Sequence, residues 1–340
     1  MVSCGLDSRP GANIRMPPEA EKELKGIRLR GWAYQFPKLS VNPLNRTGMS
    51  AATVDAKASG TLTIGGDLTV NRLGFGAMRI TGEGIWGEPK NPYEARKVLR
   101  RAIELGVNFI DTADSYGPEV SERLIAETLH PYPRDLVIAT KGGLTRQGPN
   151  AWVPVGRAEY LKQCVEMSLR RLRVERIDLY QLHRIDPKVP VEESVGALKE
   201  LQDAGKIRHI GLSEVKPDEI EQANKVARIV SVQNRYNISD REHEEMLNYC
   251  DRHGLAFIPW FPVAAGKLAQ RDGPLGEAAK RHGVSIAQLS IAWLLHRSKV
   301  MLPIPGTSSV AHLEENVASA ALELSDSEWT EIEAKAKPKR

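Results

Sequence analysis

Two hydrophobic patterns alternate along the chain from residue 61 onward. Segments with apolar residues at helical spacing, every three or four positions, alternate with short runs rich in Val, Ile and Leu. Residues 92–106 show the helical pattern and end at a glycine, and residues 107–114 show the strand pattern that follows it. This alternation predicts parallel strands joined by crossover helices.

The number of repeats predicts a closed barrel. We expect strands at 72–78, 107–114, 135–143, 177–183, 207–214, 229–237, 255–260 and 300–306, and helices at 92–106, 119–130, 157–172, 192–206, 217–227, 243–254, 274–283, 285–297, 308–318 and 325–337. Eight such units in an α/β chain match a (β/α)8 TIM barrel. An open doubly wound sheet is the alternative, and it would carry GxGxxG after its first strand; the run GFGAMR at 74–79 lacks the third glycine.

The N-terminal part of the chain has a different character. The run TLTIGGDLTV at 61–70 predicts a β-hairpin that turns at two glycines, and we expect it to close the bottom of the barrel. Residues 1–60 show no sustained period, so we predict an irregular, disordered extension there and the barrel domain at 61–340. Residues 1–48 are either an upstream extension ahead of a start at Met49 or a genuine disordered tail.

The charge distribution, the length of the apolar runs and the cysteine content argue against a nucleic-acid-binding protein, a membrane protein and a metal site. Of 47 basic and 43 acidic residues, nine and five lie in residues 1–60, so the other 38 and 38 balance. The basic excess therefore predicts no nucleic-acid groove, and no apolar run is long enough for a membrane helix. Three widely spaced cysteines predict no metal site and favour a reduced, cytoplasmic protein. We expect a small-molecule partner and a monomer or weak homo-oligomer.

Four reactive residues lie at or just after the ends of successive predicted strands. They are Asp111, Tyr116, Lys141 and His183. The carboxyl ends of barrel strands share one mouth, so these side chains are expected to meet. Taken singly, each is more commonly a packing, capping or solvated residue. Together they have the chemistry of a carbonyl reductase: a Tyr proton donor, a Lys that lowers its pKa, an Asp that holds the Lys, and a His that positions the carbonyl oxygen.

The chain resembles the aldo-keto reductase superfamily. The similarity covers residues 61–335 and rests on RLGFGAM, DTADSYG, TKGG, YQLH, IGLSE, VQNRYN and IPGTSSVAHLEENV. It implies a (β/α)8 barrel with NADPH extended across its mouth, and it implies that Tyr116 is the proton donor, with Asp111, Lys141 and His183 as its partners.

The resemblance also implies a set of cofactor contacts. Besides Asp111, they are Gly76, Ala77, Met78, Ser213, Glu214, Gln233, Trp260, Pro262, Gly306, Thr307, Ser308, His312, Glu315 and Asn316. Ser213 and Gln233 would bind the nicotinamide carboxamide, and Trp260 replaces the usual stacking Tyr. Glu214 replaces the usual Asn. Gly306 and His312 replace a Lys and an Arg that grip the 2′-phosphate in many members, so NADPH is expected and NADH stays possible.

Two loop tryptophans are candidate substrate contacts beside His183. Trp86 follows the first predicted strand, and Trp152 lies in the loop that follows the third. Either ring could line a pocket with flat apolar surface, or simply pack its own loop. The run GEGIWGEP and the IPGTSSVAHL segment resemble a bacterial and fungal branch that includes pyridoxal reductases, which suggests pyridoxal or another aromatic aldehyde.

Two other functional classes remain open. The same fold serves as an NADPH-binding regulatory module, resembling potassium-channel β subunits with slow turnover, and intact reactive residues do not exclude that role. A Schiff-base lyase would use Lys141 as its nucleophile. The position of Asp111 favours an ion-paired Lys instead.

Overall fold

The structure is a computed structural model that describes residues 54–263 and 273–336. The predicted extension at 1–48 lies outside these residues. Within the predicted segment 1–60, a short 3-10 helix spans Ala56–Ser59, and Ala56 is fully buried in a core cluster. Packed structure therefore begins before residue 61.

An antiparallel hairpin follows, as the two glycines predicted. Strand β1 (Thr61–Ile64) pairs with β2 (Leu68–Asn71), and Gly65 and Gly66 make the turn with φ of 66° and 97°. Glycine adopts such positive φ values without a steric cost. The buried hairpin side chains form one cluster with residues inside the barrel, which includes Phe109 and Val137 from the first residues of β4 and β5. The hairpin thus closes the end of the barrel where the strands begin.

Seven parallel strands form the main sheet. Their order is β11 (Ala256–Phe257), β10 (Ile229–Gln233), β9 (Ile207–Ser213), β8 (Ile177–Leu182), β5 (Val137–Gly142), β4 (Phe109–Asp111) and β3 (Phe75–Gly76). Neighbours in space are also neighbours along the chain, apart from a small separate hairpin between β5 and β8. This order is the one that repeated strand–helix units give in a barrel rather than in a doubly wound sheet.

The eighth predicted strand, at 300–306, closes the ring between β11 and β3. Two main-chain hydrogen bonds join it to β11: Phe257 N donates to Val300 O, and Leu302 N donates to Phe257 O, both at 2.9 Å. Two more join it to β3 and the residue before it: Gly74 N donates to Pro303 O at 3.0 Å, and Gly76 N donates to Pro305 O at 3.5 Å. Pro303 and Pro305 have no N–H to donate, so the segment pairs irregularly. The barrel predicted from the sequence is therefore confirmed.

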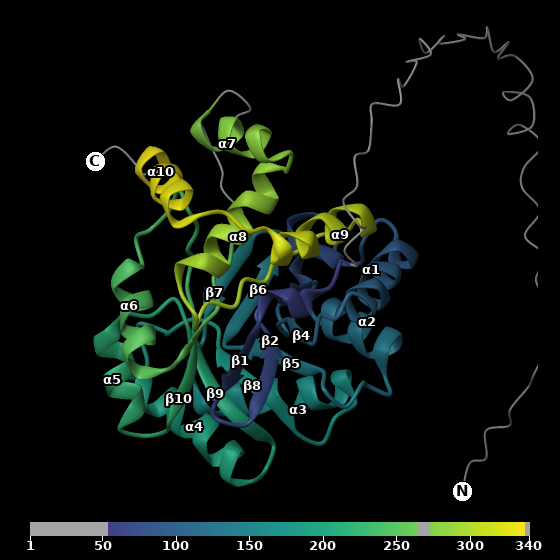
Figure 1. Cartoon of the computed structure of the whole chain (residues 1–340). Coiled ribbons are helices and arrows are strands. Elements are labelled where there is room, and N and C mark those ends of the chain that lie inside the picture. The colour runs from purple at the N-terminus through teal and green to yellow at the C-terminus, as the bar shows by residue number, and fades with distance from the viewer. Residues whose placement is uncertain (1–53, 264–272, 337–340) are drawn as a thin grey trace, which may run out of the picture. The chain divides into compact units, whose positions relative to one another are not determined.

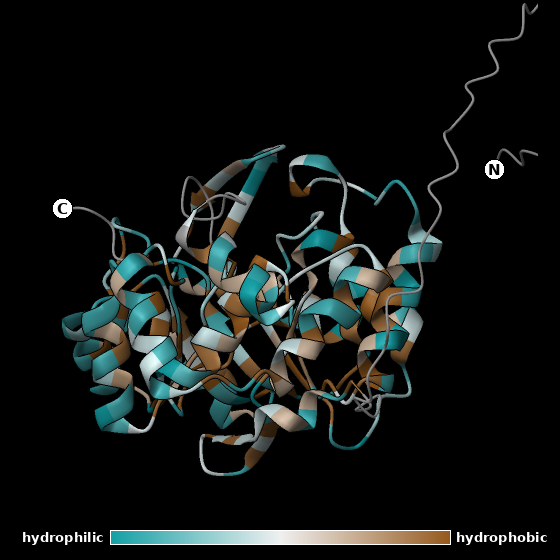
Figure 2. Cartoon of the chain, turned by 45° about the horizontal axis from the view of Figure 1, so that its top comes forward, coloured by the Kyte–Doolittle hydropathy of each residue, from teal (hydrophilic) through white to brown (hydrophobic). Residues whose placement is uncertain are grey.

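Helices surround the strands (Figure 1). They are α1 (Pro92–Glu104), α2 (Val120–Leu129), α3 (Ala158–Leu172), α4 (Val191–Asp203), α5 (Pro217–Asn224), α6 (Glu244–His253), α7 (Pro274–His282), α8 (Ile286–Arg297), α9 (Val310–Ala318) and α10 (Asp326–Ala336). The mixture of hydrophobic and hydrophilic positions along them is visible in Figure 2 and reflects one face packed on the core. Within the described residues, no helix combines the length and apolar character needed to span a membrane.

The segment after the third barrel strand differs from expectation. The sequence predicts a loop there, but strands β6 (Leu144–Gly148) and β7 (Ala151–Pro154) pair as an antiparallel hairpin. Its turn contains Gly148 and Asn150, both with positive φ. Such residues are the usual turn formers, so the signal was present in the run RQGPNAW.

Candidate active site

The side chains expected at the barrel mouth come together there. Asp111 ends β4, Ser213 ends β9 and Gln233 ends β10, while Lys141 lies in β5 and His183 directly follows β8. Because the strands are parallel and neighbouring, their carboxyl ends open on the same side of the barrel.

Lys141 is the centre of the buried polar group. Its ammonium lies 2.7 Å from Asp111 Oδ2, donates to Thr112 O at 2.8 Å, and lies 3.4 Å from the Tyr116 hydroxyl. Gln233 Nε2 donates to the other Asp111 oxygen at 2.8 Å, and Gln181 Nε2 does so at 3.2 Å. Lys141 is fully buried and Asp111 is 2% exposed, so the pair is held by several partners away from water.

The electrostatics differ in part from expectation. Burial raises the pKa of Tyr116 above its usual value, and the Lys141 charge only partly opposes this. The ammonium acts in the predicted direction, but the loss of solvent outweighs it. Burial also works against the charge of Lys141, yet Asp111 and Tyr116 together raise the pKa of Lys141 above its usual value. The phenol is therefore protonated and the amine charged at neutral pH.

His183 is held neutral. Burial first, and then the positive charges of Lys141 and Arg184, lower the pKa of His183 well below its usual value. Its Nδ1 lies 3.3 Å from the Ser115 hydroxyl. Its ring centroid is 5.9 Å from that of Tyr116 in an edge-on arrangement. Both groups can therefore face the same ligand atom as hydrogen-bond donors.

A cleft of about 920 Å³ opens over this group. It is lined by most of the residues predicted as site residues: Gly76, Met78, Asp111, Tyr116, Trp152, His183, Ser213, Gln233, Trp260, Pro262, Gly306, Thr307, His312, Glu315 and Asn316. Five other predicted residues, Ala77, Lys141, Trp86, Glu214 and Ser308, do not line it. The cleft has the size of a small-molecule or cofactor site.

Two glycines bring the backbone close together at one end of the cleft. A Cβ at Gly76 would lie 2.6 Å from Ile304 O, and a Cβ at Gly306 would lie 2.6 Å from Gly76 O. Only glycine therefore fits at either position. Helix α9 begins beside this point, and its N-cap residue Ser309 makes no side-chain capping bond. Backbone N–H groups at a helix N-terminus favour an anionic group.

Glu214 and Trp86, both predicted as site residues, do not line the cleft. Glu214 Oε1 accepts hydrogen bonds from Trp260 Nε1 at 2.5 Å and from Arg235 N at 2.7 Å. The carboxylate thus holds the Trp260 ring in place instead of facing the cleft. Trp86 is 38% exposed and stands outside the cleft, whereas Trp152 lies in its wall.

Three arginines were not singled out from the sequence. Arg79 and Arg184 line the cleft, and Arg184 Nη1 donates to His183 O at 2.6 Å and to Ser213 Oγ at 2.9 Å. Arg146 lies behind Trp152, with its guanidinium carbon 3.6 Å from the ring centroid. The signal for Arg184 was its position directly after His183. Arg79 lies in a short 3-10 helix (Ala77–Ile80) and Arg146 lies in β6, and the sequence shows no regular period at either place.

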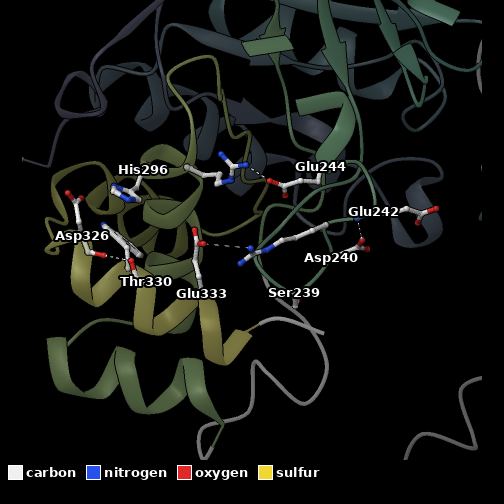
Figure 3. Close-up of a pocket in the computed structure, with 11 residues that line it drawn as sticks. Ser239, Asp240, Glu242, Glu244, His296, Asp326, Thr330 and Glu333 are labelled. Atoms are coloured by element: carbon white, nitrogen blue, oxygen red, sulfur yellow. Dashed lines mark hydrogen bonds and ion pairs between the residues drawn. The ribbon is translucent and has the colours of Figure 1, made fainter. Parts of the chain in front are cut away.

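A second hollow, of about 1210 Å³, lies against α6, α8 and α10 (Figure 3). Its charges are largely paired with one another, since Arg297 contacts Glu244 and Arg241 lies 3.8 Å from Glu333. His296 stacks on Trp329. The reactive side chains described above belong to the other cleft, which we therefore take as the candidate active site.

The chain is similar in sequence and in fold to known proteins. A model described as "Aldo/keto reductase family" matches residues 72–337. An uncharacterized oxidoreductase of Schizosaccharomyces pombe is 51% identical over 294 residues, covering 86% of this chain and 95% of that protein. Pyridoxine 4-dehydrogenase of Escherichia coli is 42% identical over 275 residues, covering 79% and 96%. The structure of an aldo-keto reductase from Klebsiella pneumoniae in complex with NADPH has the same fold, with TM-score 0.70, 24% identity and coverage of 82% and 96%.

Proposed function

This chain belongs to the aldo/keto reductase family, and on that premise we propose that it reduces an aldehyde or ketone to an alcohol, with NADPH as reductant and Tyr116 as proton donor. The observation that carries the proposal is the contact of one buried ammonium, Lys141, with both the Asp111 carboxylate and the Tyr116 hydroxyl in the floor of the cleft. A buried ammonium in contact with a phenol suits the transfer of a proton to a bound ligand.

The cleft residues fit a dinucleotide. Ser213 and Gln233 offer hydrogen bonds to an amide, and Trp260 offers a flat ring. The close backbone approach at Gly76 and Gly306, beside the start of α9, fits the phosphate-bearing part. The bound dinucleotide supplies a hydride, which no side chain can provide.

Ser213 and Gln233 are set up as a complementary pair. Ser213 Oγ accepts from Arg184, which leaves its own hydroxyl proton free to donate. Gln233 uses its Nε2 on Asp111, which leaves its amide oxygen free to accept. One donor and one acceptor side by side match the oxygen and nitrogen of a carboxamide.

Tyr116 and His183 then serve the carbonyl oxygen. The Tyr116 phenol donates its proton as negative charge develops on that oxygen, and neutral His183 donates a hydrogen bond to it. Lys141 stabilises the phenolate that remains, and Asp111 fixes the position of the ammonium. Because the phenol is buried, it keeps its proton until a substrate takes it.

We propose an aromatic aldehyde such as pyridoxal as the substrate. The support is the flat ring of Trp152 in the cleft wall, near both Tyr116 and His183, and the 42% identity to the Escherichia coli pyridoxine 4-dehydrogenase. We propose a preference for NADPH over NADH because Arg79 and His312 place basic side chains at the end of the cleft near Gly306.

The first test is NADPH oxidation at 340 nm with pyridoxal and with 4-nitrobenzaldehyde, each repeated with NADH. We expect turnover in the wild type and a loss of at least about a hundredfold in Tyr116→Phe, because the proton donor is gone. NADPH affinity, measured by fluorescence titration, should change little.

The possible outcomes separate the alternatives. Loss of both turnover and NADPH binding in Tyr116→Phe would indicate a folding defect, and an unchanged rate would mean that another group is the acid. Tight NADPH binding by the wild type without turnover of either aldehyde would contradict the reductase and favour the regulatory module.

A further inference from the structure

Arg146 joins three separate segments around the substrate end of the cleft. It lies in β6, and its guanidinium donates to five main-chain carbonyls: Ile85 O at 2.8 Å, Ser115 O at 2.6 Å, Gly84 O at 3.1 Å, Gly148 O at 3.2 Å and Ala151 O at 2.9 Å. These acceptors belong to the loop after β3, to the loop after β4 and to the β6–β7 hairpin. An arginine has five N–H donors, so each has an acceptor.

The same guanidinium packs on the wall of the cleft. Its central carbon lies 3.6 Å from the Trp152 ring centroid and 5.6 Å from that of Trp86. A cation at this distance is attracted to the face of an indole. No carboxylate among the described residues pairs with Arg146, so its position is set by the main-chain carbonyls and the indole rings rather than by a salt bridge.

Trp152 in turn faces the reacting side chains. Its ring centroid is 6.4 Å from that of Tyr116 and 6.2 Å from that of His183, both in edge-on arrangements. Arg146 also bonds the carbonyl of Ser115, the residue next to Tyr116 and the partner of His183 Nδ1. One side chain therefore fixes both the flat wall and the loop that carries the proton donor.

Other contacts show how tightly the joined loops fit. Gly117 N donates to Ile85 O at 3.3 Å, and Asn150 N donates to Gly84 O at 3.0 Å. A Cβ on Gly84 would lie 2.7 Å from Pro149 Cβ. These backbone contacts bring the loops together but do not involve the Trp152 side chain, which Arg146 and Tyr116 contact directly.

We propose that Arg146 is a positioning and specificity-determining residue: it fixes Trp152 as a flat wall beside Tyr116 and His183, and so selects planar aromatic carbonyl compounds over small aliphatic ones. The proposal rests on the proposed reductase function. A rigid ring gives an aromatic substrate a stacking surface, whereas a two- or three-carbon aldehyde is too small to use it.

The test compares Arg146→Met and Arg146→Lys with the wild type on 4-nitrobenzaldehyde and on propanal. We expect kcat/KM for the aromatic aldehyde to fall at least about tenfold, mostly through KM, and that for propanal to fall less than about threefold. Lysine keeps the charge but has three donors, so Arg146→Lys should recover only part of the selectivity. Gln147→Met, in the same strand with an exposed side chain, is the matched control and should match the wild type.

A second measurement does not depend on turnover. Hydrogen exchange should speed up in Arg146→Met in peptides covering 82–90 and 144–154 together, with no change in peptides from α4 or α5. Equal loss on both aldehydes, or unchanged exchange in these two peptides, would overturn the proposal. If the wild type reduces neither aldehyde, the proposed function fails, and the exchange result still decides whether Arg146 links the loops.

Discussion

The carboxyl group of Asp114, in the mouth region, is costly to ionise. Burial first, and then the nearby Glu122 carboxylate, raise the pKa of Asp114 to about 7. Its Oδ1 is buried without a hydrogen-bond partner among the described residues. A carboxylate in such a place disfavours folding once it is ionised.

This shift predicts a pH effect on stability. The pKa is higher in the folded chain than in the unfolded one, so the contribution of Asp114 is complete below about pH 4 and is lost as the pH rises through about 7. Relative to the wild type, Asp114→Asn should gain about 4 kcal/mol in unfolding free energy between pH 4 and pH 8. Urea unfolding at several pH values measures this difference.

Asp186→Asn is the control, because its effect on the unfolding free energy should change with pH in the opposite direction. Backbone N–H groups of Gly156 and Lys188 lower the pKa of Asp186 below its usual value. Removing that charge should lower the unfolding free energy above about pH 4, and this loss should disappear as the pH falls below the pKa of Asp186 in the folded chain. A parallel pH response of the two variants would contradict this assignment.

At the residue scale, the sequence predicted the reactive centre better than its surroundings. Asp111, Lys141 and His183 could be placed because each lies at or next to the carboxyl end of a strand of a regular repeat. The pKa of Tyr116 could not, because burial of the phenol depends on side chains such as Trp152 that reach it from a distant hairpin. The hydrogen bond between Glu214 and Trp260 likewise could not be predicted, because it depends on where the Trp260 ring lies in space.

At the scale of elements, the hydrophobic period and the turn residues predicted the strands and helices that follow the strand–helix repeat. The barrel strands and the hairpin β1–β2 were predicted, whereas β6–β7 was interpreted as a loop. Strand β6 lies outside the main sheet and its exposure does not alternate between buried and exposed residues, so it lacks the pattern that marks a half-buried strand.

The β1–β2 hairpin gives a prediction at the element scale. Ile64 is 1% exposed and packs with residues inside the barrel. Ile64→Ala should lower the unfolding free energy by about 2–5 kcal/mol because it leaves a cavity, while KM stays unchanged because the reactive residues lie at the opposite end. Thr63→Ala, on the exposed face of β1, removes only the exposed hydroxyl contact with Thr69, so it should lower the unfolding free energy by less than about 1 kcal/mol and leave KM unchanged. Chemical denaturation and steady-state kinetics on the three proteins test this.

At the scale of the whole molecule, binding should stabilise the fold. A dinucleotide held by the proposed contacts engages Gly76 from β3 and Gly306 at the end of the closing segment, on the two sides of one seam of the barrel. With NADP⁺ at about 100 times its Kd, we expect about 2.7 kcal/mol of added stability. Differential scanning calorimetry should show a rise in Tm that grows with NADP⁺ concentration. An unchanged Tm at saturating NADP⁺ would contradict the proposed binding site.

The closing segment also determines when the cleft is completed during synthesis of the chain. Asp111, Tyr116, Lys141 and His183 leave the ribosome early, yet the ring stays open until residues 300–306 follow and join β11 to β3. Domains form as the chain emerges from its N-terminus. A truncated or stalled product therefore carries the full set of reactive residues but lacks the last wall of the cleft. Retention of the dinucleotide would thus mark a finished chain and distinguish it from an abortive one.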